Sequence, residues 1–483
     1  MTKIFSENAE APIPLVVDLD GTLTPTDTLV ESVFSLLKKN PANILLLFFW
    51  LFAGRAGFKR RVATASNFSI ETIPWREDFL GWLRDQHKDG RILILATAAH
   101  QTIADDAARH LGFFQQVIST DGGDNLKGAA KLQEIQKTIG TRFSYAGDSS
   151  ADLPIWHVAE TAVLVGASRA VRREVHDNAK VEIEFQNQKV GFAVWLRALR
   201  VHQWLKNVLL FVPILAAFAF NDVAKMTAVL IAFVSFSFAA SATYIFNDLW
   251  DLESDRKHPR KRYRPFASAS LSILHGVAVA GMLLLASLIL ACLVSYSFAA
   301  MVVGYIVLTT LYSWTLKHYV LIDVLMLAVL YTFRVLAGSV ATQVPITQWL
   351  LAFSIFMFFG LALIKRCAEL KSLQMAQKKS TEGRDYRVDD LAVLWPLGIA
   401  ASLCSVVVFG LYVGTPQTMS SYANADLLWL VGIGLLYWNA RLWIKTGRGE
   451  MHDDPIVFAA RDFGSQLTLL TMVGLTVLAR FVG

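Results

Sequence analysis

The chain is poor in charged residues and in cysteine. Only 17% of its 483 residues are Asp, Glu, Lys or Arg and 54% are hydrophobic, which excludes an ordinary soluble protein of this size. Its three cysteines (Cys292, Cys367 and Cys404) are scattered, so neither a disulfide framework nor a cysteine metal site is expected. Residues 1–14 are polar and acidic and form no cleavable signal sequence, so we expect the N-terminal part to stay in the cytosol.

The apolar residues gather in the second part of the chain. Up to about residue 190 the chain reads as a soluble α/β sequence, and after about residue 204 it becomes a series of apolar runs of bilayer-spanning length. We predict nine spans, at about 205–221, 226–247, 270–293, 297–315, 320–341, 348–365, 391–412, 426–444 and 464–482. The net charge of +6 falls in particular loops, which indicates membrane topology and phosphate handling rather than nucleic-acid binding.

The basic loops predict an orientation in the membrane. Lys and Arg concentrate in the loops after the second, fourth, sixth and eighth spans, whereas the other loops are nearly free of them, Lys225 being the exception. Because cytosolic loops carry the positive charge, we expect these loops and the N-terminus on the cytosolic side. The soluble part and the loop after the second span would then face the same compartment.

That loop contains three aspartates at helical spacing. Asp248, Asp251 and Asp255 would share one face of a helix. A basic run follows them directly and consists of Arg256, Lys257, Arg260, Lys261, Arg262 and Arg264. Carboxylates hold a hard cation and basic side chains hold phosphate oxygens, so the pair of clusters predicts a site for a magnesium-bound diphosphate at the membrane surface.

The soluble part carries chemistry at the ends of its predicted strands. The apolar run 13–17 ends in Asp18-Leu-Asp20-Gly-Thr, and the run 92–96 ends in Thr97. Lys127 follows the loop 121–125, and the strand 143–146 ends in Gly-Asp148-Ser-Ser-Ala-Asp152. Ligands of doubly wound folds bind beyond the carboxyl ends of the strands, so these residues are expected to meet.

This ordered set resembles the haloacid dehalogenase (HAD) superfamily over residues 12–170. The resemblance implies an α/β Rossmannoid phosphatase in which Asp18 is the nucleophile and Asp20 the general acid/base. Thr97 and Lys127 would bind phosphoryl oxygens. Magnesium would be held by Asp18, Asp20 and Asp148 with support from Asp152. A degenerate domain kept for docking is the alternative.

A mainly helical insertion at about 27–75 occupies the position of a small cap in this superfamily. Its apolar segment 44–53 is too short to span a bilayer and is followed by Arg55, Lys59, Arg60 and Arg61. Two readings stay open. The segment is either the core of the cap or a surface that dips into the bilayer.

The membrane part resembles UbiA-type intramembrane prenyltransferases over residues 195–483. The first shared motif is Asn247-Asp-x-x-Asp-x-x-x-Asp255 with the following basic residues, and it implies catalytic roles for Asp248 and Asp251. The second runs from Tyr312 to Asp323, with Arg334 and Gly338 beyond it. Aromatic prenyltransferases usually carry paired aspartates there, whereas this chain has Leu327 four residues after Asp323.

Three patterns look like the decaprenyl-phosphate phosphoribosyltransferase branch: Tyr312-Ser-x-x-Leu-Lys317, Gln203-Trp-x-Lys206-Asn207 and His452-Asp-Asp-Pro455. That branch joins a polyprenyl phosphate to 5-phosphoribosyl diphosphate (PRPP). The resemblance implies that the metal is bound by Asp248, Asp251 and Asp255. It implies that the substrates are bound by Lys206, Asn247, Lys257, Lys261, Arg262, Arg264, Lys317, Asp323 and Arg334.

We therefore predict a fusion: an α/β HAD-like domain with a small cap (1–186), then an all-α membrane domain of nine helices (187–483). The expected enzyme uses Mg²⁺, sits in the bacterial cytoplasmic membrane, and makes a lipid-linked ribose 5-phosphate that its phosphatase trims. An aromatic prenyltransferase fused to a phosphatase is the main alternative. An inert membrane sensor and two unrelated activities are the others, and the sequence does not indicate an oligomeric state.

Overall fold

The computed structural model describes residues 13–66, 68–120, 126–187, 191–377, 384–451 and 454–482. The chain forms two compact units, Met1–Ala198 with Ile245–Ala278, and Leu199–Tyr244 with Val279–Gly483. It therefore leaves the first unit near residue 198 and returns to it for residues 245–278. This return brings the aspartate cluster into the same unit as the α/β fold.

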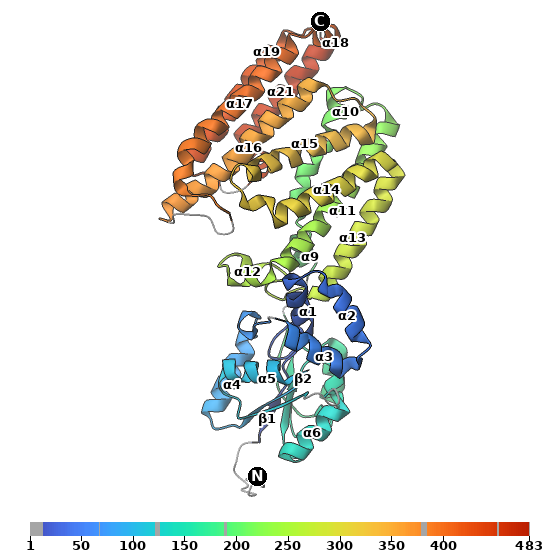
Figure 1. Ribbon diagram of the computed structural model, residues 1–483, viewed down its shortest axis with the longest axis vertical. Helices are drawn as coiled ribbons and strands as arrows, with labels where there is room; N and C mark the ends of the chain where they lie inside the picture. The colour runs from blue at the N-terminus through green and yellow to red at the C-terminus, as the bar shows by residue number, and fades with distance from the viewer. Residues whose placement is uncertain are drawn as a thin grey trace. The chain divides into compact units, whose positions relative to one another are not determined.

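A parallel sheet forms the centre of the first unit, with the strand order β3-β2-β1-β4-β5-β6 (Figure 1). The strands are β1 (Leu15–Val17), β2 (Leu93–His100), β3 (Gln116–Thr120), β4 (Ser144–Gly147), β5 (Ala162–Val165) and β6 (Val181–Phe185). Helices cover both faces, so the inner strands are apolar on both sides. The predicted α/β fold is confirmed.

The side chains of β1 alternate between two hydrophobic cores, as the pleat requires. Leu15 and Val17 join the core on one face, and Val16 joins the core on the other. The first core includes α4 (Glu77–Lys88) and α5 (Gln101–Leu111), and the second includes α6 (Ala129–Ile139), α7 (Leu153–Trp156) and α8 (Arg169–Asn178). Packing on both faces fixes the position of the loop that follows β1.

Three helices between β1 and β2 occupy the region of the expected cap. They are α1 (Thr28–Lys39), α2 (Asn43–Leu51) and α3 (Gly54–Ala65), followed by the short η1 (Ile70–Thr72). Asp27 starts α1 by accepting hydrogen bonds from the backbone amides of Leu29 and Val30. The small core between the three helices consists of Leu36, Leu47 and Val62.

The described residues include eight helices long and apolar enough to cross a membrane. They are α11 (Val223–Trp250), α13 (Ile273–Val294), α14 (Tyr296–Trp314), α15 (Ile322–Thr342), α16 (Gln348–Met375), α17 (Leu391–Val413), α19 (Leu427–Gly447) and α21 (Phe463–Phe481). They match eight of the nine predicted spans. The first predicted span is a shorter apolar segment, made of η3 (Val201–Phe211) and α10 (Val212–Ala216).

Two hydrophobic clusters hold these helices together. Residues of α15 belong to both, packing with α11 and α14 in one and with α16, α17, α19 and α21 in the other. The last four helices lie side by side in Figure 1. The shorter helices are α9 (Phe192–Ala198), α12 (Leu252–Lys257), η4 (Lys261–Tyr263), η5 (Leu316–His318), η6 (Val388–Asp390), α18 (Pro416–Ser421) and α20 (Pro455–Arg461). The chain is thus a multi-span membrane protein.

Candidate active site

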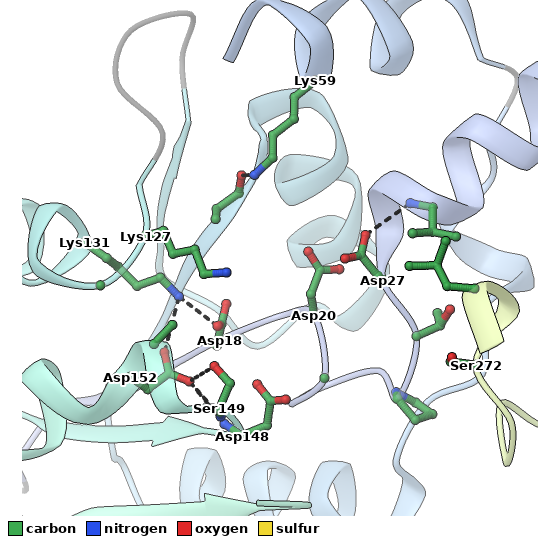
Figure 2. A pocket seen from close by; sticks show the side chains of 18 of the residues that line it. Asp18, Asp20, Asp27, Lys59, Lys127, Lys131, Asp148, Ser149, Asp152 and Ser272 are labelled. Carbon is green, nitrogen blue, oxygen red and sulfur yellow. Dashed lines mark hydrogen bonds and ion pairs between the residues drawn. The ribbon is translucent and has the colours of Figure 1, made fainter. Parts of the chain in front are cut away.

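A cavity of about 340 Å³ lies beyond the carboxyl ends of β1 and β4. Its acidic lining consists of Asp18, Asp20, Asp27, Asp148 and Asp152, and its basic lining of Lys59, Lys127 and Lys131. Figure 2 shows the three lysines and Asp18, Asp20 and Asp148 directed toward a shared space. Of the residues predicted to meet at the strand ends, the cavity is lined by Asp18, Asp20, Lys127, Asp148 and Asp152, and Thr97 is not part of its lining.

Asp18 is held in place by the backbone and by a buried lysine. Its Oδ1 accepts a hydrogen bond of 2.8 Å from the amide of Leu19, and its Oδ2 lies 2.7 Å from Nζ of Lys131. Lys131 is 2% exposed and also donates to the hydroxyl of Tyr145 at 3.1 Å. A carboxylate fixed at both oxygens beside a cation is oriented for attack on an electrophile such as phosphorus.

Asp20 contacts the first residue of the cap helix α1. Its Oδ1 accepts a hydrogen bond of 2.8 Å from the amide of Thr28. Burial and the neighbouring Asp27 raise the pKa of Asp20 to about 7. A carboxyl group with this pKa exchanges a proton near neutral pH, as a general acid/base must.

Gly21, in the loop after β1, lies so close to Asp148 in the loop after β4 that no side chain fits at its position. Gly21 has φ +79°, and a Cβ on it would lie 2.2 Å from Oδ2 of Asp148. Nη2 of Arg76 donates to the carbonyl of Gly21 at 2.9 Å and fixes the same turn. The loops after β1 and β4 therefore meet only because this position lacks a side chain.

Three carboxylates fit a divalent cation. One oxygen each from Asp18, Asp148 and Asp152 lie within 4.8 Å of one another. Burial, with Asp152 and Asp18 nearby, raises the pKa of Asp148 to about 7, although Arg76 and Lys131 oppose the shift. Asp152 also accepts hydrogen bonds from Ser149 and Tyr145, which suits a supporting role. Hard oxygen ligands of this kind are those that Mg²⁺ prefers.

Lys131 was not among the residues predicted from sequence. The prediction chose Lys127, which lines the cavity from the loop before α6, whereas Lys131 on α6 is the lysine that contacts Asp18. The repeated lysine at a spacing of four was the available signal. Thr97 is buried inside β2, where its hydroxyl accepts from the amide of Ala99 at 3.0 Å, and the neighbouring Ala98 lines the cavity.

One wall of the cavity comes from a distant part of the sequence. Ser272, Ile273 and Leu274 line it, at the start of the membrane helix α13. The same segment is tied to the cap, because Arg256 makes hydrogen bonds of 2.6 and 3.1 Å to the carboxylate of Glu31 on α1. Both side chains of this pair are at least nine-tenths buried. Local sequence patterns carried no signal for these contacts.

The three aspartates at the end of α11 and the start of α12 follow one another along the helical backbone. Backbone hydrogen bonds of 2.9 Å join Asp251 to Asn247 and Asp255 to Asp251, although α11 ends at Trp250 and α12 begins at Leu252. Nη1 of Arg264 lies 3.1 Å from Asp248 and 2.6 Å from Asp255. Arg264 therefore bridges Asp248 and Asp255. Among the described residues, the carboxylates close enough to share a metal ion are those of Asp18, Asp148 and Asp152, so a shared site that includes Asp251 stays a prediction.

One carboxylate oxygen of these three aspartates is buried without a hydrogen-bond partner in the described part of the chain. Asp255 is 1% exposed, and its Oδ1 has no hydrogen-bond partner among the described residues. Burial raises the pKa of Asp255, although Arg264 opposes the shift. A buried oxygen without a partner is costly, and a bound cation would satisfy it.

The remaining basic residues of this loop are open to solvent. Lys257, Lys261 and Arg262 are exposed, and Arg262 lies over the ring of Tyr263 at 4.9 Å. Lys317 is half-buried in η5. Exposed basic side chains are available to a phosphate group, but their geometry does not assign them to one substrate.

In the second unit, Lys206 in η3 contacts Asp454 in the loop before α20. Nζ of Lys206 lies 2.7 Å from Asp454, which also receives Lys365 at 3.3 Å and the hydroxyl of Tyr331 at 3.0 Å. Asp454 belongs to the predicted His452–Pro455 pattern, of which His452 and Asp453 lie outside the described residues. Lys365 and Tyr331 had not been predicted as members of this cluster.

Arg334, which the sequence predicts to contact a substrate, is buried among side chains of the second unit. It donates to Asn207 at 3.0 Å and to the hydroxyl of Tyr305 at 3.0 Å. Gly338, one turn further, lets α15 approach η3, because a Cβ there would lie 2.1 Å from the carbonyl oxygen of Leu210. The two patterns Lys206-Asn207 and Arg334 to Gly338 are therefore in direct contact.

Asp323 is fully buried and paired with a cation that had not been predicted. Its carboxylate forms an ion pair with Arg366 and accepts a hydrogen bond of 2.7 Å from the hydroxyl of Tyr312. Glu369 receives the same Arg366. An aspartate enclosed in this way stabilises the helix packing directly.

Comparison with known proteins finds two families along the chain. Residues 208–476 match the UbiA prenyltransferase family, and residues 15–157 match the haloacid dehalogenase-like hydrolases. An uncharacterized protein, y4nM of Sinorhizobium fredii, is 37% identical over 457 residues, 93% of this chain and 88% of the relative.

Two further matches cover part of the chain. The decaprenyl-phosphate phosphoribosyltransferase of Mycolicibacterium smegmatis is 34% identical over 224 residues, 45% of this chain and 69% of that protein. A solved UbiA homolog from Archaeoglobus fulgidus, bound to GPP and Mg²⁺, covers 60% of this chain and 100% of its own, with 14% identity and a TM-score of 0.45.

Proposed function

Because the chain belongs to the UbiA prenyltransferase family and carries a haloacid dehalogenase-like hydrolase, we propose that it is a bifunctional membrane enzyme. Its membrane part transfers 5-phosphoribosyl from PRPP to a polyprenyl phosphate, and its phosphatase removes the 5-phosphate. The observation that carries the proposal is a cavity that gathers Asp18, Asp20 and Asp148 with lysines, on a chain similar to decaprenyl-phosphate phosphoribosyltransferase.

The first reaction is a substitution at a sugar carbon. An oxygen of the lipid phosphate attacks the ribose carbon that bears the diphosphate, the bond from that carbon to the diphosphate breaks, and pyrophosphate leaves. Asp248, Asp251 and Asp255 supply the oxygen ligands for Mg²⁺, which would neutralise the leaving diphosphate. Arg264, which already lies beside two of these aspartates, is in place to contact its oxygens.

The second reaction is hydrolysis of the phosphate monoester left on the ribose. Asp18 attacks phosphorus, and Asp20 protonates the departing ribose oxygen. Asp20 then takes a proton from the water that hydrolyses the aspartyl phosphate. Lys131 holds Asp18 in position, while Lys127 is in the cavity to balance phosphoryl charge. When bound among Asp18, Asp148 and Asp152, Mg²⁺ would add further charge stabilisation.

The two proposed activities act on one product in sequence. The transfer yields a lipid that still bears a phosphate monoester, and a phosphatase on the same chain removes it. A product that joins a prenyl group to an aromatic acid would offer the phosphatase no such monoester. We place both activities at the cytosolic face of a bacterial cytoplasmic membrane, following the distribution of basic loops.

The test uses the purified full chain with labelled PRPP, a polyprenyl phosphate and Mg²⁺, and resolves the lipid products by mass. A polyprenyl-phosphoryl-ribose should form together with pyrophosphate. Asp251→Ala should stop transfer yet keep hydrolysis of p-nitrophenyl phosphate, and Asp89→Ala, near the end of α4, is the matched control. Transfer from a prenyl diphosphate to an aromatic acid, without any use of PRPP, would overturn the proposal.

A further inference from the structure

The cap helix α2 exposes nearly all of its large apolar side chains. The exposed fractions are 61% for Ile44, 65% for Leu45, 46% for Leu46, 59% for Phe48, 65% for Phe49 and 62% for Leu51, and Phe52, just beyond the helix, is 78% exposed. Leu47 is buried in the small core of the cap. The segment is therefore not the core of the cap, the first of the two readings left open by the sequence.

An apolar surface of this density does not remain in water. Soluble proteins rarely expose a contiguous patch of this kind unless something covers it. The helix has nine residues, so its length of about 14 Å is roughly half the thickness of a bilayer core. It can lie in a membrane surface but cannot cross.

The charge around α2 fits an anionic bilayer. Lys39 at the end of α1 and Arg60 and Arg61 on α3 are exposed. Residues 32–66 contain no Asp or Glu, so no acidic side chain of this segment opposes them. Exposed aromatic and leucine side chains flanked by basic ones are characteristic of segments that bind the headgroup region of acidic lipids.

The first unit also contains the start of a membrane span. Ile273 and Leu274 open α13 and line the same cavity as Val30 of α1 and Lys59 of α3. Those two helices are the ones against which α2 packs (Figure 1). Cap residues and the first residues of the membrane helix α13 thus line one cavity.

We propose that α2 and Phe52 insert into the boundary between headgroups and acyl chains of an anionic bilayer, and so hold the phosphatase cap at the membrane surface. The covering partner is phospholipid rather than a second copy of the chain. The proposal concerns lipid contact alone and stands whatever substrate the cavity takes.

The test places an environment-sensitive fluorophore on the cap of the full chain. Phe49→Cys and Phe52→Cys are made in a background with Cys292, Cys367 and Cys404 replaced by serine, labelled with NBD, and reconstituted into vesicles of phosphatidylglycerol and phosphatidylcholine. Arg173→Cys on α8, whose side chain is 86% exposed, is the water-exposed control. Thermal unfolding of each labelled variant verifies that it is folded.

We expect blue-shifted emission at both cap positions and quenching by lipids that carry a nitroxide at the top of the acyl chain, while the control is not quenched. Arg60→Glu with Arg61→Glu should lower the quenching at position 52 by about twofold or more in the anionic vesicles. Cap emission and quenching equal to those of the control would overturn the proposal. So would emission that follows the protein-to-lipid ratio but ignores the nitroxide, since a second copy would then cover α2.

Discussion

Buried carboxyl groups have different surroundings in the phosphatase cavity and in the helical unit. In the cavity, the pKa values of Asp20 and Asp148 are raised to about 7, because buried carboxylates crowd one another. In the helical unit, Asp454 is matched by two lysines, and Asp323 by Arg366. The difference separates a cavity lined by five aspartates and three lysines, where a cation could balance the excess negative charge, from carboxylates that basic side chains already neutralise.

The largest expected effect comes from the proposed nucleophile. Asp18→Asn keeps the shape of the side chain but removes its nucleophilic carboxylate, so hydrolysis of p-nitrophenyl phosphate should fall about 10³-fold or more. Asp106→Asn, an exposed carboxylate of α5 paired with Arg109, should leave the rate unchanged. Equal rates for both variants would contradict the assignment of the cavity.

The next effect distinguishes the two lysines of the cavity. Lys131→Met removes the cation that contacts Asp18 and should lower the same rate about 10²–10³-fold. Lys127→Met should cost less, and the exposed Lys137→Met should cost nothing. A larger loss for Lys127→Met would show that the lysine chosen from the sequence is the one that acts.

A smaller effect tests whether Asp323 is a structural residue. Asp323→Asn leaves Arg366 without its buried partner and should lower the unfolding free energy by about 3–5 kcal/mol. The change is measured by thermal unfolding in detergent, with the exposed Asp426→Asn as control. An unchanged unfolding temperature together with lost transfer would instead place Asp323 on the substrate.

The smallest effects come from two ion pairs that tie the cap to the loop after α11. Glu31→Gln disturbs the buried pair with Arg256 and should cost about 1–3 kcal/mol. Lys38→Gln removes the pair with Glu253, whose side chains are both 37% exposed, and should cost less than about 1 kcal/mol. Equal costs would mean that burial does not distinguish the two pairs.

Much of the architecture followed from local patterns. The apolar runs that end in Asp18, Thr97 and Asp148 predicted strands, because a parallel sheet buries such runs on both faces. Eight of the predicted spans were recovered as long helices, because apolar length is a strong local signal. The helical spacing of Asp248 and Asp255 likewise agrees with their common contact to Arg264.

What local patterns missed was contact between distant segments. Arg256 and Glu31 are 225 positions apart, and Lys206 and Asp454 are 248 apart. No periodicity records such a pair, because only the packed fold brings its members together. Lys131 was missed for another reason. Lys127 and Lys131 are four positions apart, and only the fold places Lys127 in the loop before α6 and Lys131 on the helix, against Asp18.

The most direct test of the whole account follows the lipid product of Asp18→Asn. The full chain is given PRPP, a polyprenyl phosphate and Mg²⁺, and the lipids are resolved by mass. The account predicts that the variant accumulates a ribosylated lipid that keeps its 5-phosphate, whereas the unaltered chain releases the phosphate-free product. The same final lipid from both proteins would contradict the account.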